Sequence, residues 1–283
     1  MKIVRYGEPG REKPGIIDSQ GKIRDLSGAI TDIDAEVLAS DFAALRSFDV
    51  DKLPAVPDGQ RLGPPVARVG HFIAIGLNYA DHAAETGAPI PSEPIVFSKA
   101  PSCIVGPNDD VIIPKDSAKT DWEVEIAIVI GKRASYVSKE RALDHVAGYC
   151  VCNDVSEREF QIERGGQWMK GKGCPTFGPL GPWLVTRDEV GDVQDLSMWL
   201  DVNGQRMQTG STKTMIFDCA HVVSYTSQFM TLEPGDVITT GTPPGVGLGM
   251  KPPRFLKAGD VVTLGIEKLG EQRQTFVAYK PAA

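Results

Sequence analysis

The sequence predicts a β-rich α+β fold, and three observations carry that prediction. Short apolar runs bounded by Gly, Pro, Asn or Asp recur from residue 66 onward, which is typical of strands. The run 121–130 places an apolar side chain at every second position, the period of a sheet. Few segments show the spacing of an amphipathic helix, and those that do are short.

Residues 1–65 are predicted to form a small N-terminal α+β domain, and residues 66–283 a larger domain. In the small domain, 3–6 is an expected strand, 15–18 and 22–26 an expected hairpin, and 37–48 an expected helix. A stretch rich in Pro and Gly follows at 53–65 and indicates a linker.

In the larger domain, strands alternate with a few short helices. The expected strands are 72–75, 95–97, 103–105, 111–113, 121–130, 147–152, 183–185, 198–202, 237–239 and 261–264. The expected helices are 78–85, 139–145, 217–230 and a segment that begins near residue 156.

Composition restricts the classes of function. Among 283 residues, 41% are hydrophobic and 24% charged, as in a soluble globular protein. The net charge of −7 argues against a nucleic-acid partner. No apolar run approaches the length of a membrane span, and the N-terminus lacks the apolar core of a signal peptide, so we expect a cytoplasmic protein without membrane contact. Five cysteines without a Cys-x-x-Cys pair indicate reduced thiols.

Two glutamates stand out in the run 121–130. Glu123 and Glu125 share one face of the expected strand, about 6.6 Å apart along it. The alternative is a solvated strand face, since Glu is mostly exposed. However, Ala127 and Val129 continue the same face and indicate burial. A buried pair of like charges must be neutralised, and a hard divalent cation with oxygen ligands does this well.

A third carboxylate follows the next apolar run. Asp154 comes after the expected strand 147–152, at a point where sheet proteins often place functional groups. Ser156 and Glu159 then form an S-x-x-E capping box, which predicts that a helix begins there. Together with Glu123 and Glu125, Asp154 predicts an open site of carboxylates suited to Mg²⁺ or Mn²⁺.

His82 and Glu85 are separated by three residues on the expected helix 78–85, so they share a face. A histidine oriented by a carboxylate can act as a general base on water. A solvent-facing ion pair is the alternative. Gly and Pro residues on both sides of the helix indicate a segment that can move as a lid.

Further polar residues could contact a substrate. Arg158 and Gln161 share a face of the helix expected after Asp154, and an arginine can bind a carboxylate through two nitrogens. Lys172 lies in a Gly-flanked segment, expected to be a loop, and could stabilise an enolate. Thr242 lies in a Gly-Thr-Pro turn that could bind a carboxylate. For Arg158 and Lys172 the alternative is a solvated surface position.

These segments resemble the fumarylacetoacetate hydrolase family. They follow the family's order and span residues 70 to 275, and the matching stretches are GLNYADHAAE (76–85), KTDWEVE (119–125), NDVSEREFQ (153–161), GKGCPTFGP (171–179) and PGDVITTGTPPGVG (234–247). The resemblance implies a mixed β-roll catalytic domain, a homodimer, and Mg²⁺ or Mn²⁺ as cofactor.

The resemblance also implies roles for individual residues. Glu123, Glu125 and Asp154 match the metal ligands, whereas His82 and Glu85 match a dyad on the segment that closes over the substrate. Lys172 matches the family's catalytic lysine. Arg158 and Gln161 match its substrate-facing positions, and Thr242 matches its carboxylate-binding turn. The chain has Leu77 where close relatives acting on small acylpyruvates or oxaloacetate often have Arg.

The activity expected from this resemblance is metal-dependent hydrolysis of a C–C bond in a 2,4-diketo acid, which yields pyruvate and a second acid. Sequence features are similar to a bacterial branch labelled ureidoglycolate lyase or 2-hydroxyhepta-2,4-diene-1,7-dioate isomerase, some members of which resemble hydrolases of 2,4-diketo-3-deoxy-rhamnonate or -fuconate. The alternatives are decarboxylation or tautomerisation of a 2-oxo diacid such as oxaloacetate, a ureidoglycolate lyase, and a metal-binding protein without catalysis.

Overall fold

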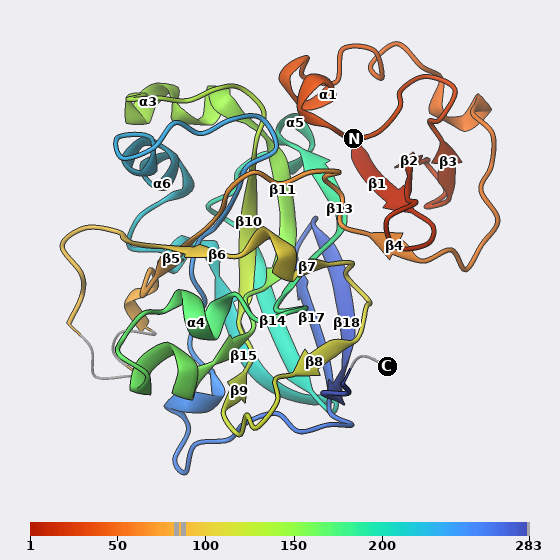
Figure 1. The fold of residues 1–283 in the computed structure, drawn as a ribbon. Coiled ribbons are helices and arrows are strands. Elements are labelled where there is room, and N and C mark those ends of the chain that lie inside the picture. The colour runs from red at the N-terminus through yellow and green to blue at the C-terminus, as the bar shows by residue number, and fades with distance from the viewer. Residues whose placement is uncertain (82–84, 86–88, 282–283) are drawn as a thin grey trace.

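The computed structural model describes residues 1–81, 85 and 89–281, and it confirms the β-rich α+β fold (Figure 1). One large sheet and one smaller sheet pack against each other, and the first 65 residues form a lobe at one side of the large sheet. The predicted helix 78–85 lies partly outside the described residues, because residues 82–84 fall there.

The larger sheet has 11 strands and crosses the whole molecule. Its strands are β1 (Lys2–Tyr6), β2 (Lys13–Ile17), β3 (Ile23–Asp25), β4 (Leu62–Gly63), β5 (Phe72–Gly76), β6 (Ile95–Lys99), β7 (Ile104–Val105), β10 (Val124–Ile130), β11 (Val146–Asn153), β13 (Gly178–Thr186) and β16 (Val237–Thr239). Their order is β3-β2-β1-β13-β11-β10-β16-β5-β6, with β4 on β1 and β7 on β13. The sheet is mixed, because β16 pairs with β5 in parallel while β10 and β11 are antiparallel.

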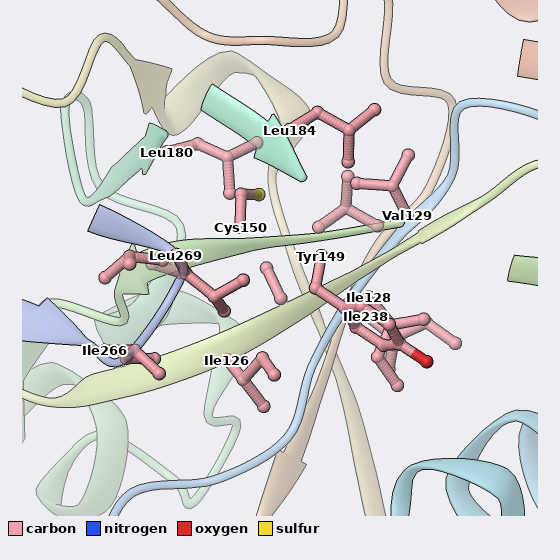
Figure 2. Packing of buried hydrophobic residues seen from close by; sticks show 14 of the residues in the cluster. Ile126, Ile128, Val129, Tyr149, Cys150, Leu180, Leu184, Ile238, Ile266 and Leu269 are labelled. Atoms are coloured by element: carbon pink, nitrogen blue, oxygen red, sulfur yellow. The ribbon is translucent and has the colours of Figure 1, made fainter. Parts of the chain in front are cut away.

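The smaller sheet has five strands in the order β15-β14-β17-β18-β8. These are β8 (Val111–Ile113), β14 (Ser197–Val202), β15 (Gln205–Ser211), β17 (Val261–Ile266) and β18 (Gly270–Ala278), and a separate short pair joins β9 (Thr120–Asp121) to β12 (Ser156–Glu157). Side chains from both sheets form one continuous apolar core, which includes Ile126, Tyr149, Leu180 and Ile266 (Figure 2).

Burial on both faces explains the position of β10. Every residue from Val124 to Ile130 is buried, as the sequence predicted for the inner part of this strand. β10 pairs with β11 in a register that sets Val124 opposite Asn153. The ends of the two strands therefore coincide, and the residues just outside them, Glu123 and Asp154, are brought together.

The helices are short and lie at the edges of the sheets. They are α1 (Ala35–Ala39), α3 (Lys139–Ala142), α4 (Met169–Lys172), α5 (Arg187–Val190) and α6 (Cys219–Thr226), with a π-helical turn at Glu159–Glu163 and 3₁₀ turns at Val50–Lys52, Pro101–Cys103, Leu143–His145, Thr212–Thr214 and Gly247–Gly249. Two predicted helices, 37–48 and 217–230, are shorter than expected. The first is interrupted at Asp41 and Phe42, whose φ angles are 52° and 57°. None of the helices in the described part of the chain is long and apolar enough to cross a membrane.

Two strands of the smaller sheet, β15 and β18, were not predicted. β18 carries buried glutamines where an alternating strand would carry apolar residues, because Gln272 and Gln274 point into the core and are almost fully buried. Their amides are satisfied by backbone oxygens, such as that of Val151 at 2.8 Å from Gln272 Nε2. A polar residue at an inward position hides the hydrophobic period from sequence analysis.

The N-terminal lobe joins the rest of the chain through β1, which pairs with β13. A group of ion pairs, the lobe clamp, surrounds this junction and consists of Arg5, Arg61, Glu12, Asp32 and Asp109. Arg5 Nε lies 2.7 Å from Asp32 Oδ1, and Arg61 Nη2 lies 2.6 Å from Asp109 Oδ2. Glu12 accepts a hydrogen bond from Arg61 Nη1 at 3.0 Å. Independent folding of residues 1–65 as a domain stays a prediction.

Candidate active site

Three carboxylates meet where β10 and β11 end. Glu123 directly precedes β10, Glu125 is its second residue, and Asp154 directly follows β11. The backbone N–H of Asp154 donates to the backbone oxygen of Glu123 at 2.9 Å, which extends the strand pairing by one step. One carboxylate oxygen from each side chain lies within 4.8 Å of the other two, and all three residues are buried.

Two lysines form ion pairs with Glu123 and Asp154. Lys172, at the end of α4, donates from Nζ to Glu123 Oε2 at 2.6 Å and to Asp154 Oδ2 at 2.7 Å. Lys99, at the end of β6, places its Nζ 2.6 Å from Asp154 Oδ1, at an angle that does not make a hydrogen bond. Both ammonium groups are almost completely buried. Their charges offset part of the negative charge of the three carboxylates.

Arg158 binds two carboxylates, those of Asp121 and Glu123. Its Nε donates to Asp121 Oδ2 at 2.8 Å, and its Nη2 donates to Glu123 Oε1 at 2.6 Å. Its Nη1 donates to Gln161 Oε1 at 3.1 Å, which confirms that Arg158 and Gln161 share a face. Asp121 also accepts backbone N–H groups from Gly247 and Leu248, so the arginine is fixed on both sides.

The charge balance differs between the two glutamates. Burial alone would raise the pKa of Glu123, but Lys172 and Arg158 lower that pKa to about 2. Burial raises the pKa of Glu125 well above its usual range, and the neighbouring charges of Asp154 and Glu123 raise it further. Without a cation, the neutral form of the Glu125 carboxyl is therefore favoured, because the surrounding lysines and arginine do not offset the charge that it would carry when ionised.

This donor set fits a hard divalent cation. Three carboxylate oxygens at mutual distances up to 4.8 Å can lie on one side of an ion such as Mg²⁺ or Mn²⁺ and leave positions for water or substrate. Glu125 is the group that most needs an additional positive charge, and Asp154 Oδ1 accepts no hydrogen bond among the described residues. Glu123, Glu125 and Asp154 are the residues that would hold the ion.

The Gly-Thr-Pro turn closes the opposite side of the site. The backbone N–H of Gly241 donates to Glu125 Oε2 at 2.9 Å. Gly241 has a φ angle of 93°, and a Cβ there would lie 2.9 Å from Asn78 Cβ, so only glycine fits. Thr242 lines the cavity, but its hydroxyl donates to the backbone oxygen of Val124 at 2.9 Å. Thr242 can therefore contact a substrate through its backbone or its methyl group rather than through its hydroxyl.

Of the predicted His82–Glu85 pair, the structure describes one member, since His82 lies outside the described residues. The Glu85 carboxylate accepts the backbone N–H of Gly245 at 3.0 and 3.1 Å. It also lies against Gly249, where an added Cβ would be 3.0 Å from Glu85 Cδ. Glu85 thus rests on the turn that follows Thr242, beside the mouth of the site.

The site opens into a cavity of about 210 Å³. Its floor holds the three carboxylates with Arg158 and Lys172, and its walls include Phe97, Trp168, Ile162 and Leu248. A larger open hollow of about 1260 Å³ lies elsewhere, along residues 113–118 and 250–258. That hollow contains none of the predicted site residues, so the smaller cavity is the candidate active site.

The structure corrects two local predictions. The helix expected to begin near residue 156 starts later, as the π-helical turn Glu159–Glu163, because Ser156 and Glu157 form β12 and pair with β9. The Ser156 hydroxyl instead donates to the backbone oxygen of Asp154 at 3.0 Å. Lys172 is not on a loop but ends the one-turn helix α4, where it is buried rather than solvated.

Several residues of the site were not predicted from sequence. Lys99 lies in a strand that carries no motif, Asp121 lies in the KTDWEVE stretch but was given no role, and Trp168 lies between two predicted segments. The lysine offers one signal: it ends a mostly apolar strand, 95–99, where an unpaired charge would be costly. Trp168 offers no signal beyond its residue type.

A family model described as fumarylacetoacetate (FAA) hydrolase, C-terminal, matches residues 71–277. The chain belongs to the fumarylacetoacetate hydrolase family. A Burkholderia multivorans relative named "Putative hydrolase" is 62% identical over 276 residues, covering 97% of this chain and 98% of the relative. Membership in this family supports the interpretation of the protein as a hydrolase-like enzyme, and it agrees with the fold and the motifs described above.

Solved structures of family members are similar over the whole chain. Fumarylacetoacetate hydrolase from Exiguobacterium antarcticum has a TM-score of 0.89 at 38% identity, and a probable 2-hydroxyhepta-2,4-diene-1,7-dioate isomerase from Mycobacterium abscessus has 0.85 at 35%. Maleylpyruvate hydrolase from Sphingobium sp. SYK-6, in complex with manganese(II) ion and pyruvate, has 0.83 at 28%. Each match covers 99% of this chain and 100% of the other.

Proposed function

We propose that this protein hydrolyses the C3–C4 bond of a 2,4-diketo acid and releases pyruvate and a second carboxylic acid. The observation that carries the proposal is the arrangement of Glu123, Glu125 and Asp154 around Lys172 in one buried cavity. Such a floor can receive the oxygens of a 2-oxo acid. The Sphingobium relative, which holds manganese and pyruvate, supports this choice of product.

The residues of the floor bind and orient the 2-oxo acid end. An Mg²⁺ or Mn²⁺ ion held by the three carboxylates would supply Lewis acidity and offset negative charge. Lys172 has three N–H donors, of which two point to Glu123 and Asp154. The same Nζ lies 3.5 Å from the backbone oxygen of Asp154, a weak contact that a substrate oxygen can replace. Lys172 is therefore placed to stabilise an enolate oxygen.

Hydrolysis also needs an activated water, and we assign this step to His82 with Glu85. His82 takes a proton from water while the water oxygen bonds to C4. The C3–C4 bond then breaks, its electron pair passes to the three-carbon fragment as pyruvate enolate, and a proton is added at C3. The contact of Glu85 with Gly245 supports the proposal, because Gly245 directly precedes Val246 of the cavity lining.

The proposal is tested by pyruvate release from a panel of 2,4-diketo acids, with Mg²⁺ or Mn²⁺ and after exhaustive chelation. We expect turnover with the ion, loss of turnover after chelation, and recovery when the ion is returned. Full turnover in the chelated protein would contradict the role of the three carboxylates. Absence of pyruvate release from every diketo acid would contradict the hydrolase assignment itself.

A second candidate is decarboxylation or tautomerisation of a 2-oxo diacid, which the isomerase named among the similar structures favours. This chemistry uses the same enolate but no activated water. We therefore expect His82→Ala to lower the kcat of diketo-acid hydrolysis by about 10²–10⁴-fold and to spare any oxaloacetate decarboxylation. Lys172→Ala should impair both reactions. If His82→Ala hydrolyses its best diketo acid at the wild-type rate, the assignment of water activation to His82 and Glu85 is wrong, and the two residues form only a surface ion pair.

A further inference from the structure

The cavity has a charged floor and an apolar wall. Besides the charged and polar groups, seven apolar side chains line the space: Ile75, Leu77, Phe97, Ile162, Trp168, Val246 and Leu248. They come from the end of β5, from β6, from the segment between β12 and α4, and from the turn after Thr242. A molecule bound through its 2-oxo acid end must lay its remaining carbons along this wall.

Trp168 is the fixed part of the wall. Its ring packs against Phe97 in an edge-to-face arrangement, with ring centroids 5.1 Å apart. It also lies over Gly76, where an added Cβ would be 2.5 Å from the indole ring. The chain therefore leaves room for the indole by having no side chain at residue 76, so the wall is a packed aromatic surface rather than a mobile one.

Both cations that line the cavity are already paired. Arg158 is bound to Asp121 and Glu123, and Lys172 is bound to Glu123 and Asp154. Lys99, beneath the floor, is paired with Asp154. None of these groups can turn to a second carboxylate at the wall without leaving a buried carboxylate unpaired.

The neighbouring segments add no further Lys or Arg to the described lining of the cavity. Residues 77–98 contain no Lys or Arg in the sequence. On the other side, Arg164 donates to Glu159, and Lys170 donates to the backbone oxygen of Arg164, both at exposed positions outside the cavity lining. A negative charge near the wall would therefore meet apolar side chains and no unpaired Lys or Arg of the described lining.

The floor can accept one carboxylate. Four carboxylates, Asp121, Glu123, Glu125 and Asp154, are opposed by three cations, Lys99, Arg158 and Lys172. A divalent cation at this site leaves one net positive charge, which the single carboxylate of a monoanionic substrate offsets. A dianion would exceed this balance.

We infer that the site selects 2,4-diketo acids with one carboxylate and an apolar, uncharged tail. Phe97, Ile162 and Trp168 contact this tail and determine the specificity for it. This rests on the proposed function for the reacting end of the molecule. A terminal carboxylate on the tail is disfavoured by about 100-fold, since a buried charge without a partner is costly. A terminal hydroxyl is disfavoured less, by about 10-fold, because it loses only a neutral hydrogen bond to water.

Three substrates of equal chain length test this inference: 2,4-dioxoheptanoate, 7-hydroxy-2,4-dioxoheptanoate and 2,4-dioxoheptanedioate. We expect kcat/KM for pyruvate release to fall in that order, with about a 100-fold span. An equal or higher kcat/KM for the dioate would overturn the inference while leaving the hydrolase assignment intact.

A binding measurement separates this inference from the proposed function. Isothermal titration of the Mn²⁺-loaded protein with 2-oxoheptanoate and 2-oxoheptanedioate compares the same two tails without any bond cleavage. Tighter binding of the monoacid supports the inference even if no diketo acid is hydrolysed. Equal binding, or tighter binding of the diacid, overturns it.

A matched pair of lysine substitutions locates the selectivity. Ile162 is 50% exposed and lines the cavity, whereas Met169 is 47% exposed and lies outside the lining. Ile162→Lys should reduce the preference for the monoacid tail by at least about 10-fold, because it gives a terminal carboxylate a partner. Met169→Lys should leave the preference unchanged. If the two substitutions change the preference equally, the wall does not determine which tail binds. If Ile162→Lys does not fold, Leu248→Lys, in the turn after Thr242, provides the same test.

Discussion

The candidate active site and the lobe clamp are both built from carboxylates and basic side chains, yet they differ in whether every carboxylate is paired with a basic side chain. In the lobe clamp, Arg5 and Arg61 bind three carboxylates that spread around the junction of the lobe with the sheet. In the active site, three carboxylates converge on one point, and Glu125 has no lysine or arginine bound to it among the described residues. In the clamp each carboxylate is paired with an arginine, whereas in the site Glu125 remains available to bind a positively charged ligand.

This difference teaches that pairing alone does not identify function. Arg158 looks like Arg61, since each binds two carboxylates. What distinguishes the site is an uncompensated carboxylate that lies deep in the core beside a cavity. Substitutions that are matched between the two clusters can break or sharpen this comparison.

The largest effect is expected for Lys172→Gln. The amide keeps some hydrogen bonding but removes the positive charge beside the developing enolate, so kcat/KM for pyruvate release should fall on the order of 10²–10³-fold. Steady-state kinetics with the best diketo acid measures this fall. The control is Arg61→Gln, the corresponding loss of charge in the lobe clamp, which should leave kcat/KM of the folded protein unchanged. Equal kinetic losses in both variants would contradict the distinction between the clusters.

A loss of metal affinity with a gain in stability is expected for Glu125→Gln. The substitution removes a ligand, so the affinity for Mn²⁺ should fall more than the 10- to 100-fold that is typical for outer-shell partners. It also removes repulsion among buried carboxylates, so the chelated protein should gain about 0.5–2 kcal/mol in free energy of unfolding. Titration calorimetry and urea unfolding in chelator measure the two quantities. An unchanged Mn²⁺ affinity would exclude Glu125 as a ligand.

A loss of stability without a change in chemistry is expected for Arg61→Gln. Glu12 and Asp109 lose a partner close to the junction of the lobe, and Glu12 is well buried. The free energy of unfolding should fall by about 1–3 kcal/mol. Urea unfolding of the single variant and of Arg61→Gln with Asp109→Asn measures the effect, and the second substitution should recover part of the loss. A double variant that loses the sum of both would show that Arg61 and Asp109 do not interact.

The smallest effect is expected at the surface pair Arg46–Asp188, whose charged atoms lie 3.1 Å apart. Partial burial raises the pKa of Asp188, but Arg46 and Thr186 lower it to about 2 overall. Because the folded pKa lies below the unfolded value, the pair stabilises the protein above about pH 4, and this contribution is lost as pH falls toward 2. Both side chains are exposed, so Asp188→Asn should cost no more than about 0.5 kcal/mol at pH 7. Melting temperatures at pH 7 and pH 3 would show a larger difference between wild type and variant at pH 7.

Sequence reasoning recovered the floor of the site better than its wall. Glu123, Glu125 and Asp154 could be predicted because strand period and burial leave charged residues conspicuous at strand ends. Trp168 and Ile162 could not, because an apolar residue near a turn carries no sign that it faces a cavity. Local motifs also misled: the Ser156–Glu159 pattern suits a helix start, but pairing of β12 with β9 took precedence over it.

The division between sheet and connecting segments has a consequence for how this protein can change. The carboxylates proposed to bind the reacting end of the substrate are fixed by the β10–β11 register, in which a shift by one residue would turn Glu125 away from Asp154. The apolar side chains proposed to contact the tail lie mostly on short turns and at strand ends, where substitutions leave that register intact. Directed evolution restricted to these turns should therefore yield enzymes with new carbon skeletons as substrates but the same bond-breaking step. The same separation gives a physical basis for one scaffold serving proteins named as both hydrolases and isomerases.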